Sequence, residues 1–177
     1  MERVALLGCR GCGKTSVGRL VAQQLGWEFV DTDGLVEARA GRTIAEIFQA
    51  DGEAAFRALE RQVLVEALGH PRCVVSVGGG AVLNADSRDD LRRLALCIWL
   101  TAPPAELHRR IQSDQRSPAQ RPPLTDAGGL AEVEQILAQR WALYEAVAAH
   151  VVETTGRGVA AVAQVVVELV AAGAEEP

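Results

Sequence analysis

The segment at residues 8–15 constrains this 177-residue chain more than any other part of its sequence. It reads GCRGCGKT and matches the pattern G-x-x-x-x-G-K-[ST] at every fixed position. A short apolar run at residues 4–7 precedes it, and a helical pattern at residues 15–25 follows it. In this strand–loop–helix context, backbone N–H groups and the helix N-terminus surround a phosphate group. The sequence therefore predicts a phosphate-binding loop, in preference to a glycine-rich turn with a chance lysine.

The residues of this loop have distinct expected roles. Lys14, the single lysine of the chain, is expected to reach the β- and γ-phosphates of a nucleotide. The Thr15 hydroxyl is expected to ligate Mg²⁺. The whole set expected to bind the nucleotide here is Gly11, Cys12, Gly13, Lys14, Thr15 and Ser16.

Apolar runs alternate with helical patterns along the rest of the chain. The expected strands are residues 4–7, 27–30, 73–77, 96–100 and 151–152. The expected helices are residues 15–25, 43–49, 52–68, 87–94, 104–111, 130–149 and 159–171, with a capping box at Thr43 and Glu46. This alternation favours an α/β fold with a five-stranded parallel sheet. We expect one domain over residues 1–177, in which residues 112–129 form a long functional or mobile loop.

Two acidic residues directly follow the expected strand at residues 27–30. Asp31 and Asp33 should lie beside the phosphates, because the carboxyl ends of parallel strands face the ligand crevice. Asp31 suits the magnesium shell, and Asp33 suits a substrate hydroxyl. The alternative is that both residues only cap the next helix or form an Asx turn.

The glycines Gly78, Gly79 and Gly80 follow another expected strand at the same edge of the sheet. They would let a ligand approach the backbone and its N–H donors, although a tight strand-to-helix turn is the simpler interpretation. Arg140 interrupts an apolar helical stripe, so its guanidinium needs an anionic partner. Arg57 lies at the edge of a second stripe, where a solvated side chain is the alternative.

Composition excludes several classes of function. The net charge of −5 argues against a general nucleic-acid-binding protein. The longest apolar stretch, residues 159–172, is interrupted by Gln164 and Glu168, so we expect no membrane span. The first apolar run is too short for a secretion signal, and the four cysteines are then expected to be reduced thiols of a cytoplasmic protein.

Taken together, these segments resemble the shikimate kinase family of small P-loop enzymes. The resemblance covers nearly the whole chain and rests on GCRGCGKT, on DTD at residues 31–33, on GRTIAEIFQADGEAAFR ending at Arg57, on GGG at residues 78–80, on RP at residues 121–122 and on RWALY starting at Arg140. It implies a three-layer fold like that of nucleoside monophosphate kinases, with a mobile lid at about residues 112–129. The implied reaction transfers the γ-phosphoryl group of ATP to the 3-hydroxyl of shikimate, with one Mg²⁺ per subunit and a monomeric enzyme.

The resemblance also implies roles for individual residues. Asp33 would bind the acceptor hydroxyls, and Arg57, Arg140 and the Gly79 backbone would hold the shikimate carboxylate. Arg121 would come down with the lid onto the phosphates, although residues 117–120 lengthen this lid and leave Arg116 as the alternative cation. Arg110 and Arg157 match positions near the adenine.

Three other interpretations remain open at this stage. Another small-acceptor P-loop kinase, such as a gluconate kinase, would share residues 8–15 but would not need the two arginines and the glycines. A regulatory ATP-binding module would be expected to lack a catalytic residue, yet Lys14, Thr15, Asp31 and Asp33 are all present. Cys9 and Cys12 form a C-x-x-C pair whose oxidation or alkylation is predicted to block ATP binding, unless they only fill variable loop positions.

Overall fold

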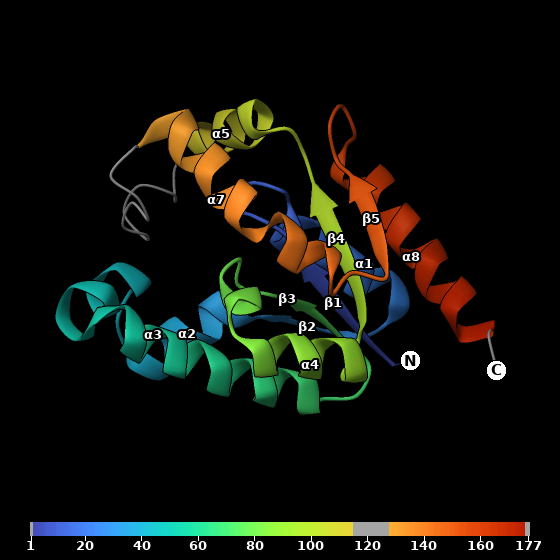
Figure 1. The fold of residues 1–177 in the computed structure, drawn as a ribbon. Coiled ribbons are helices and arrows are strands. Elements are labelled where there is room, and N and C mark those ends of the chain that lie inside the picture. Colours follow the sequence, from blue (N-terminus) through green and yellow to red (C-terminus); the bar gives the residue numbers. More distant parts are fainter. Residues whose placement is uncertain (1, 115–127, 176–177) are drawn as a thin grey trace.

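The computed structural model describes residues 2–114 and 128–175. Within these ranges, five parallel strands form one sheet in the order β2-β3-β1-β4-β5 (Figure 1). The strands are β1 (Arg3–Leu7), β2 (Glu28–Asp31), β3 (Cys73–Ser76), β4 (Leu96–Thr101) and β5 (His150–Glu153). The predicted five-stranded parallel sheet is confirmed, and its carboxyl ends all lie at one edge, as expected for parallel strands joined by crossovers.

Helices cover both faces of the sheet, which makes the fold a three-layer α/β structure. They are α1 (Lys14–Leu25), α2 (Thr32–Ala40), α3 (Ile44–Gly69), α4 (Ala85–Leu94), α5 (Pro104–Ser113), α7 (Gly129–Glu145) and α8 (Val159–Glu175), with a short 3₁₀ helix, η1 (Ala81–Leu83). Helices α1 and α8 pack against each other, and so do α5 and α7 (Figure 1). No helix in the part of the chain that the structure describes is long and apolar enough to cross a membrane.

Helix α2 is absent from the sequence-based prediction. Its nine residues, TDGLVEARA, bury only Thr32 and Val36, so there is no apolar stripe to detect. The helix begins where the Asp31 carboxylate accepts a hydrogen bond from the Asp33 backbone N–H at 3.1 Å. Its start is therefore determined by a cap rather than by periodicity.

The two helices expected at residues 43–49 and 52–68 are joined as α3, with a kink at Gly52 (φ 81°, ψ 172°). The predicted capping box is present: the Glu46 backbone N–H donates to the Thr43 hydroxyl, and the Thr43 N–H donates to the Glu46 carboxylate. A small apolar cluster around Val36, Ile47 and Phe56 packs α2 against α3. This cluster holds both helices over the carboxyl end of β2.

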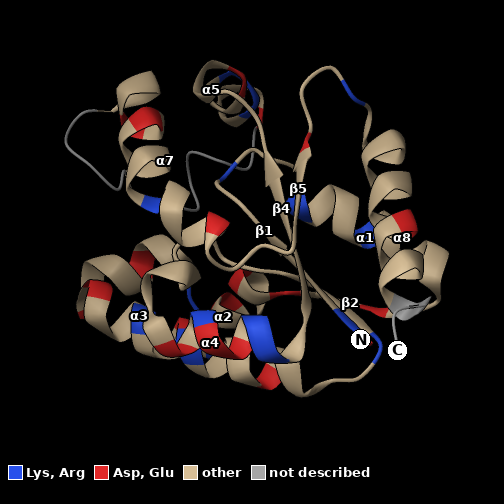
Figure 2. Ribbon diagram, turned by 45° about the vertical axis from the view of Figure 1, so that its right-hand side comes forward, with Lys and Arg blue, Asp and Glu red and all other residues tan. Residues whose placement is uncertain are grey.

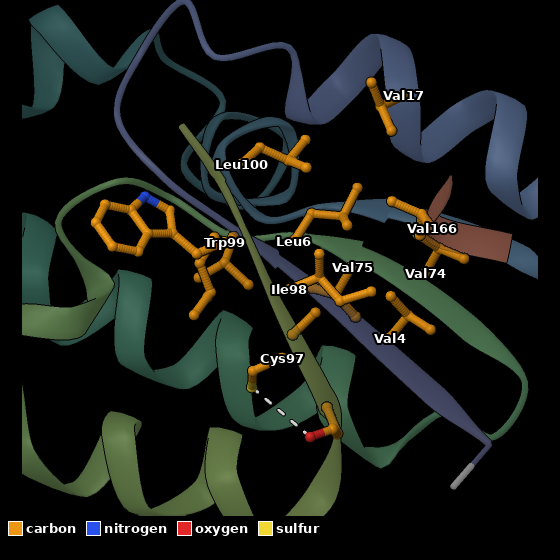
Figure 3. Packing of buried hydrophobic residues seen from close by; sticks show 14 of the residues in the cluster. Val4, Leu6, Val17, Val74, Val75, Cys97, Ile98, Trp99, Leu100 and Val166 are labelled. Carbon is orange, nitrogen blue, oxygen red and sulfur yellow. Dashed lines mark hydrogen bonds between the residues drawn. The ribbon is translucent and has the colours of Figure 1, made fainter. Parts of the chain in front are cut away.

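The main core lies on both faces of the sheet. Figure 3 shows Leu6 of β1, Val75 of β3 and Ile98 of β4 among the buried side chains, with Val17 of α1 and Val166 of α8 beside them. The three inner strands are apolar on both faces, as expected for strands covered by helices on each side. Acidic and basic residues are interspersed along α3 and α4 (Figure 2). Between these helices, the partly buried Arg61 pairs with Asp90 at 2.5 Å. The core thus forms a rigid support for the loops at the carboxyl edge.

Candidate functional site

The loop between β1 and α1 has the backbone conformation that its glycines permit. Gly8 has a φ of +135°, and a Cβ atom at this position would lie 2.3 Å from the Leu100 carbonyl oxygen. Glycine is required here for two reasons, because a side chain would strain the backbone and would also collide with β4. The loop then runs directly into α1 at Lys14.

The Lys14 side chain folds back over this loop. Its Nζ donates to the carbonyl oxygens of Gly8 at 2.7 Å and of Cys9 at 3.1 Å. These contacts hold the ammonium group against the curve of the loop. A large groove runs along the same side, and its lining includes all six loop residues expected to bind the nucleotide: Gly11, Cys12, Gly13, Lys14, Thr15 and Ser16.

Thr15 and Asp31 meet at the mouth of the groove. The Thr15 Oγ1 donates to Asp31 Oδ2 at 2.7 Å, and the same carboxylate caps α2. The helix cap expected at Asp31 is therefore confirmed, and its role as a site residue stays a prediction that this geometry allows. A hydroxyl and a carboxylate side by side suit Mg²⁺, which binds through one or two protein oxygens and substrate phosphates. The residues present fit such an ion, and no group of three or more His, Cys, Asp or Glu side chains in the described ranges forms a fuller metal site.

Arg110 is another residue that lines the groove, and it is held by several hydrogen bonds. Its guanidinium donates to Glu106 Oε1 at 2.7 Å, to Thr154 Oγ1 at 2.9 Å and to the Thr154 carbonyl at 3.0 Å. These bonds tie α5 to the loop between β5 and α8. The exposed Arg157 lies in that loop and also lines the groove. The structure thus brings both arginines to the groove, as expected.

A second cavity, of about 280 Å³, lies between α3, α5, α7 and the glycine turn after β3. Its lining includes Asp33, Arg57, Gly79, Gly80 and Arg140, so five of the six residues expected to bind the acceptor are brought together. The sixth, Gly78, does not line this cavity. Its backbone N–H donates instead to the buried Thr32 Oγ1 at 2.8 Å.

Arg140 is buried without a partner for its Nε atom. The residue is 7% exposed, and Nε has no hydrogen-bond acceptor among the described residues. A Cβ atom on Gly79 would lie 3.6 Å from Arg140 Nη1, so the guanidinium lies against the glycine turn. A buried cation in this state is costly unless an anion can pair with it. The arrangement therefore indicates an anionic ligand in the cavity.

Arg57, by contrast, is already paired. Its Nη1 donates to Glu60 at 2.7 Å, and its Nη2 lies 3.1 Å from Glu53. Glu60 is 4% exposed, and burial raises its pKa, although the charge of Arg57 opposes that effect. These carboxylates hold the guanidinium beside Gly80, where an added Cβ atom would lie 2.1 Å from Arg57 Nη1.

Tyr144 supports the opposite side of the glycine turn. Its O–H donates to the Gly79 carbonyl at 2.7 Å, and its ring stacks on Trp99 with centroids 5.4 Å apart. Burial raises the pKa of Tyr144 well above its usual value, so the phenol remains a neutral donor at physiological pH.

The sequence analysis did not predict Tyr144 and Glu60 as parts of the site. The detectable signal for Glu60 was an acid three residues after Arg57 within an apolar helical stripe.

The thiols of the C-x-x-C pair are buried in the loop. Cys9 is 5% exposed and Cys12 is 1% exposed. Burial raises the pKa of Cys9, and the weak contact between Cys9 Sγ and the Tyr144 hydroxyl at 3.7 Å opposes this effect only in part. The geometry therefore gives no support to an activated thiolate at Cys9. The expected effect of oxidation or alkylation on ATP binding stays a prediction.

The groove and the cavity are adjacent. Both are lined by Arg10, Asp33 and Ile44. A ligand phosphate in the groove and an anionic acceptor in the cavity would therefore meet beside Asp33. Such an arrangement can transfer a group between two bound molecules held in contact. The expected lid cation, Arg121 or Arg116 as its alternative, lies outside the described residues.

Comparisons with known proteins agree on one family. A family model described as shikimate kinase matches residues 10–171. A shikimate kinase of Oleidesulfovibrio alaskensis is 43% identical over 173 residues, which cover 98% of this chain and 100% of that protein. A shikimate kinase of Symbiobacterium thermophilum is 45% identical over 154 residues, which cover 87% of each chain.

Solved structures give the same result. The shikimate kinase from Acinetobacter baumannii in complex with shikimate superposes with a TM-score of 0.91 at 32% identity, over 99% of this chain and 96% of that chain. A gluconokinase from Sinorhizobium meliloti has a TM-score of 0.57 at 16% identity, over 98% of this chain and 94% of that chain. The likeness to the gluconokinase is one of fold alone.

Proposed function

The chain belongs to the shikimate kinase family, and from this premise we propose that it transfers the γ-phosphoryl group of ATP to the 3-hydroxyl of shikimate. The products are shikimate 3-phosphate and ADP, on the route to aromatic amino acids. The observation that carries the proposal is the buried Arg140, whose Nε has no acceptor and which lines the cavity next to the phosphate-binding groove. Shikimate supplies both groups that this arrangement calls for, a carboxylate and a ring hydroxyl.

The acceptor is held by residues of the smaller cavity. Arg140 and Arg57 bind the shikimate carboxylate, since a guanidinium can form two parallel hydrogen bonds with it. The Gly79 and Gly80 backbone lies beside this carboxylate. Asp33 lies where the cavity meets the groove, so it binds the 3-hydroxyl, orients it towards the phosphate and accepts its proton.

The nucleotide is held along the groove. The loop N–H groups and Lys14 bind its phosphates, and Arg110 and Arg157 lie at the adenine end. Thr15 and Asp31 hold the Mg²⁺, which neutralises phosphate charge when it is bound. Arg121, or Arg116 in its place, is proposed as the lid cation that reaches the phosphates.

Phosphoryl transfer demands positioning and charge neutralisation rather than covalent chemistry by the protein. The core strands and helices α1 and α2 position the phosphate-binding loop, Asp31 and Asp33, whereas Arg57 and Arg140 are positioned by their places within α3 and α7. The four free cysteines support a reducing compartment such as the cytoplasm.

The test is ADP release in a coupled assay with shikimate, gluconate or a nucleoside monophosphate as acceptor. Of the three acceptors, we expect only shikimate to support turnover. Removal of Mg²⁺ with EDTA should abolish that turnover.

Asp33→Asn should lower kcat by about 10²-fold or more, the usual effect of losing a general base, without weakening ATP binding. Asp51→Asn, which alters an exposed carboxylate of α3 paired with Arg42, is the control and should leave kcat unchanged. Preferred turnover of gluconate, or full activity of Asp33→Asn, would contradict the proposal.

A further inference from the structure

Arg10 occupies a position that no other described arginine shares. It is the third residue of the phosphate-binding loop, and it lines both the nucleotide groove and the acceptor cavity. Arg57 and Arg140 line only the acceptor cavity, whereas Arg110 and Arg157 line only the groove. Lys14, the other cation of the loop, lines the groove and donates to two carbonyls of the loop itself. The proposed function assigns no role to Arg10.

The surroundings of Arg10 keep its side chain charged and near the junction. The residue is half-buried, and this burial lowers its pKa. The negative charges of Asp114, at the end of α5, and Glu132, in the first turn of α7, oppose that effect. An arginine remains protonated at neutral pH under such conditions. Glu132 also lines the acceptor cavity, so Arg10 carries its charge on the α5–α7 side of that cavity.

The transferred phosphoryl group has to pass through this junction. During the reaction, the bond between the γ-phosphorus and the β,γ-bridging oxygen breaks, and a bond from the γ-phosphorus to the acceptor oxygen forms. The proton of the acceptor hydroxyl goes to Asp33, and the electron pair of the broken bond stays on ADP. Negative charge is spread over the three equatorial oxygens of the group in transit, where a cation stabilises it most.

We propose that Arg10 is a further catalytic residue, whose guanidinium contacts the phosphoryl group while it passes from the nucleotide in the groove to the acceptor in the cavity. This inference rests on the proposed function for the identity of the acceptor. It assigns to a residue of the phosphate-binding loop itself the role that an arginine finger has in other phosphoryl-transfer enzymes. Arg57 and Arg140 act on the acceptor before transfer, and Arg10 acts during transfer.

The first test compares kcat with KM in Arg10→Gln and Arg10→Lys. We expect Arg10→Gln to lower kcat by about 10²-fold or more, with KM for ATP and for shikimate changed by less than about threefold, because a transition-state contact affects kcat selectively. Arg10→Lys should recover part of the loss. The matched control is Arg92→Gln on α4, which removes an exposed arginine paired with Asp89 and should leave kcat unchanged. An unchanged kcat in Arg10→Gln would overturn the proposal.

The second test uses a transition-state analogue. ADP, Mg²⁺ and fluoroaluminate are titrated together into the protein with shikimate, and ADP with Mg²⁺ is titrated alone. We expect Arg10→Gln to weaken the fluoroaluminate complex by about the same factor as kcat and to leave ADP binding unchanged. Equal losses in both titrations, together with a lower Tm, would show a structural role and overturn the proposal.

A third measurement separates this inference from the proposed function. The slow hydrolysis of ATP without any acceptor transfers the same phosphoryl group to water, so Arg10→Gln should lower this rate as well. A wild-type protein that does not phosphorylate shikimate would contradict the proposed function alone. Equal hydrolysis rates in wild type and Arg10→Gln would overturn the role of Arg10, whatever the acceptor is.

Discussion

Arg140 and Arg57 line the same cavity but differ in burial and in hydrogen bonding. Arg57 is neutralised by Glu60 and Glu53, and its guanidinium is held beside the glycine turn before any ligand arrives. Arg140 is more deeply buried, and its Nε has no acceptor. Removing a charge from water without pairing it lowers the stability of the folded chain. Under the proposed function, a bound carboxylate would offset the free energy that the buried Arg140 costs the folded protein.

We predict that Arg140→Met stabilises the ligand-free protein and weakens binding of the acceptor. Replacing buried charges with apolar residues of similar volume is often neutral or raises the free energy of unfolding by about 1–4 kcal/mol, and we expect Arg140→Met, which removes the unsatisfied Nε, to fall in this range. Loss of charge-assisted hydrogen bonds should raise KM for shikimate by about 10-fold to 100-fold. Thermal unfolding without ligand and steady-state kinetics measure the two effects. Arg92→Met should change neither, and a lower Tm with an unchanged KM for Arg140→Met would show that the interpretation is wrong.

Among the elements, the glycine turn after β3 makes a separate contact with each of three helices. The Gly78 N–H binds Thr32 at the start of α2, and the Gly79 carbonyl accepts from Tyr144 of α7. Gly80 lies against the Arg57 guanidinium of α3. A turn of three residues thus contacts each of the helices that carry the side chains proposed to bind the acceptor.

Gly80→Ala is the sharpest test of this turn. Gly80 has a φ of −96° and a ψ of −9°, which alanine adopts without strain, so the effect of the substitution is steric. The new Cβ atom would displace the Arg57 guanidinium from Glu60, and we expect KM for shikimate to rise by about 10-fold, the effect of losing one charged hydrogen bond. Gly69→Ala on the same helix as Arg57 meets no atom within 4 Å and serves as the control for kinetics. Wild-type KM values in Gly80→Ala would contradict the role assigned to the turn.

Across the whole molecule, the chain is acidic overall, and many of its arginines form ion pairs with carboxylates. The net charge is −5, and one such ion pair joins Arg39 of α2 to Glu66 of α3. Glu106 has a comparable role near the groove, where it accepts from Arg109 and Arg110. Through Arg110 and its bonds to Thr154, this carboxylate connects α5 to the loop before α8.

We predict that acid weakens the ion pairs that Glu106 forms with Arg109 and Arg110. The two guanidinium groups lower the pKa of Glu106 to about 2 from its ordinary value of 4.5. A carboxyl group with a depressed pKa contributes stability that is fully present above its unfolded pKa and is lost as the pH falls towards the folded one. We therefore expect the difference in urea midpoint between wild type and Glu106→Gln to be largest at pH 7 and to shrink between pH 4.5 and pH 2. The pKa of Glu60 is shifted upwards, so its protonation also affects the stability of the wild type as the pH falls. Comparing wild type with Glu106→Gln at each pH removes the contribution of Glu60. A difference that does not depend on pH would contradict the prediction.

Most of the fold could be predicted because its signals are local. The phosphate-binding loop, the five strands and the capping box at Thr43 each depend on residues within a few positions of one another. Helix α2 was missed because its start depends on a side-chain cap at Asp31 and its burial on two residues alone. Of the site, Lys14, Asp33, Arg57 and Arg140 were predicted and are brought to the groove and the cavity, whereas the roles of Gly78, Glu60 and Tyr144 were not foreseen.

The amino-acid sequence by itself therefore determined the class of fold, the phosphate-binding loop and the residue types available for an anionic acceptor. Only the tertiary structure decided which arginine is paired, which is buried without an acceptor and which one lines both cavities. The physical reason is distance along the chain. Tyr144 contacts Gly79 across 65 residues, and Arg110 contacts Thr154 across 44. Pairing and burial depend on such contacts, and these exist only once the sheet has placed its carboxyl ends side by side.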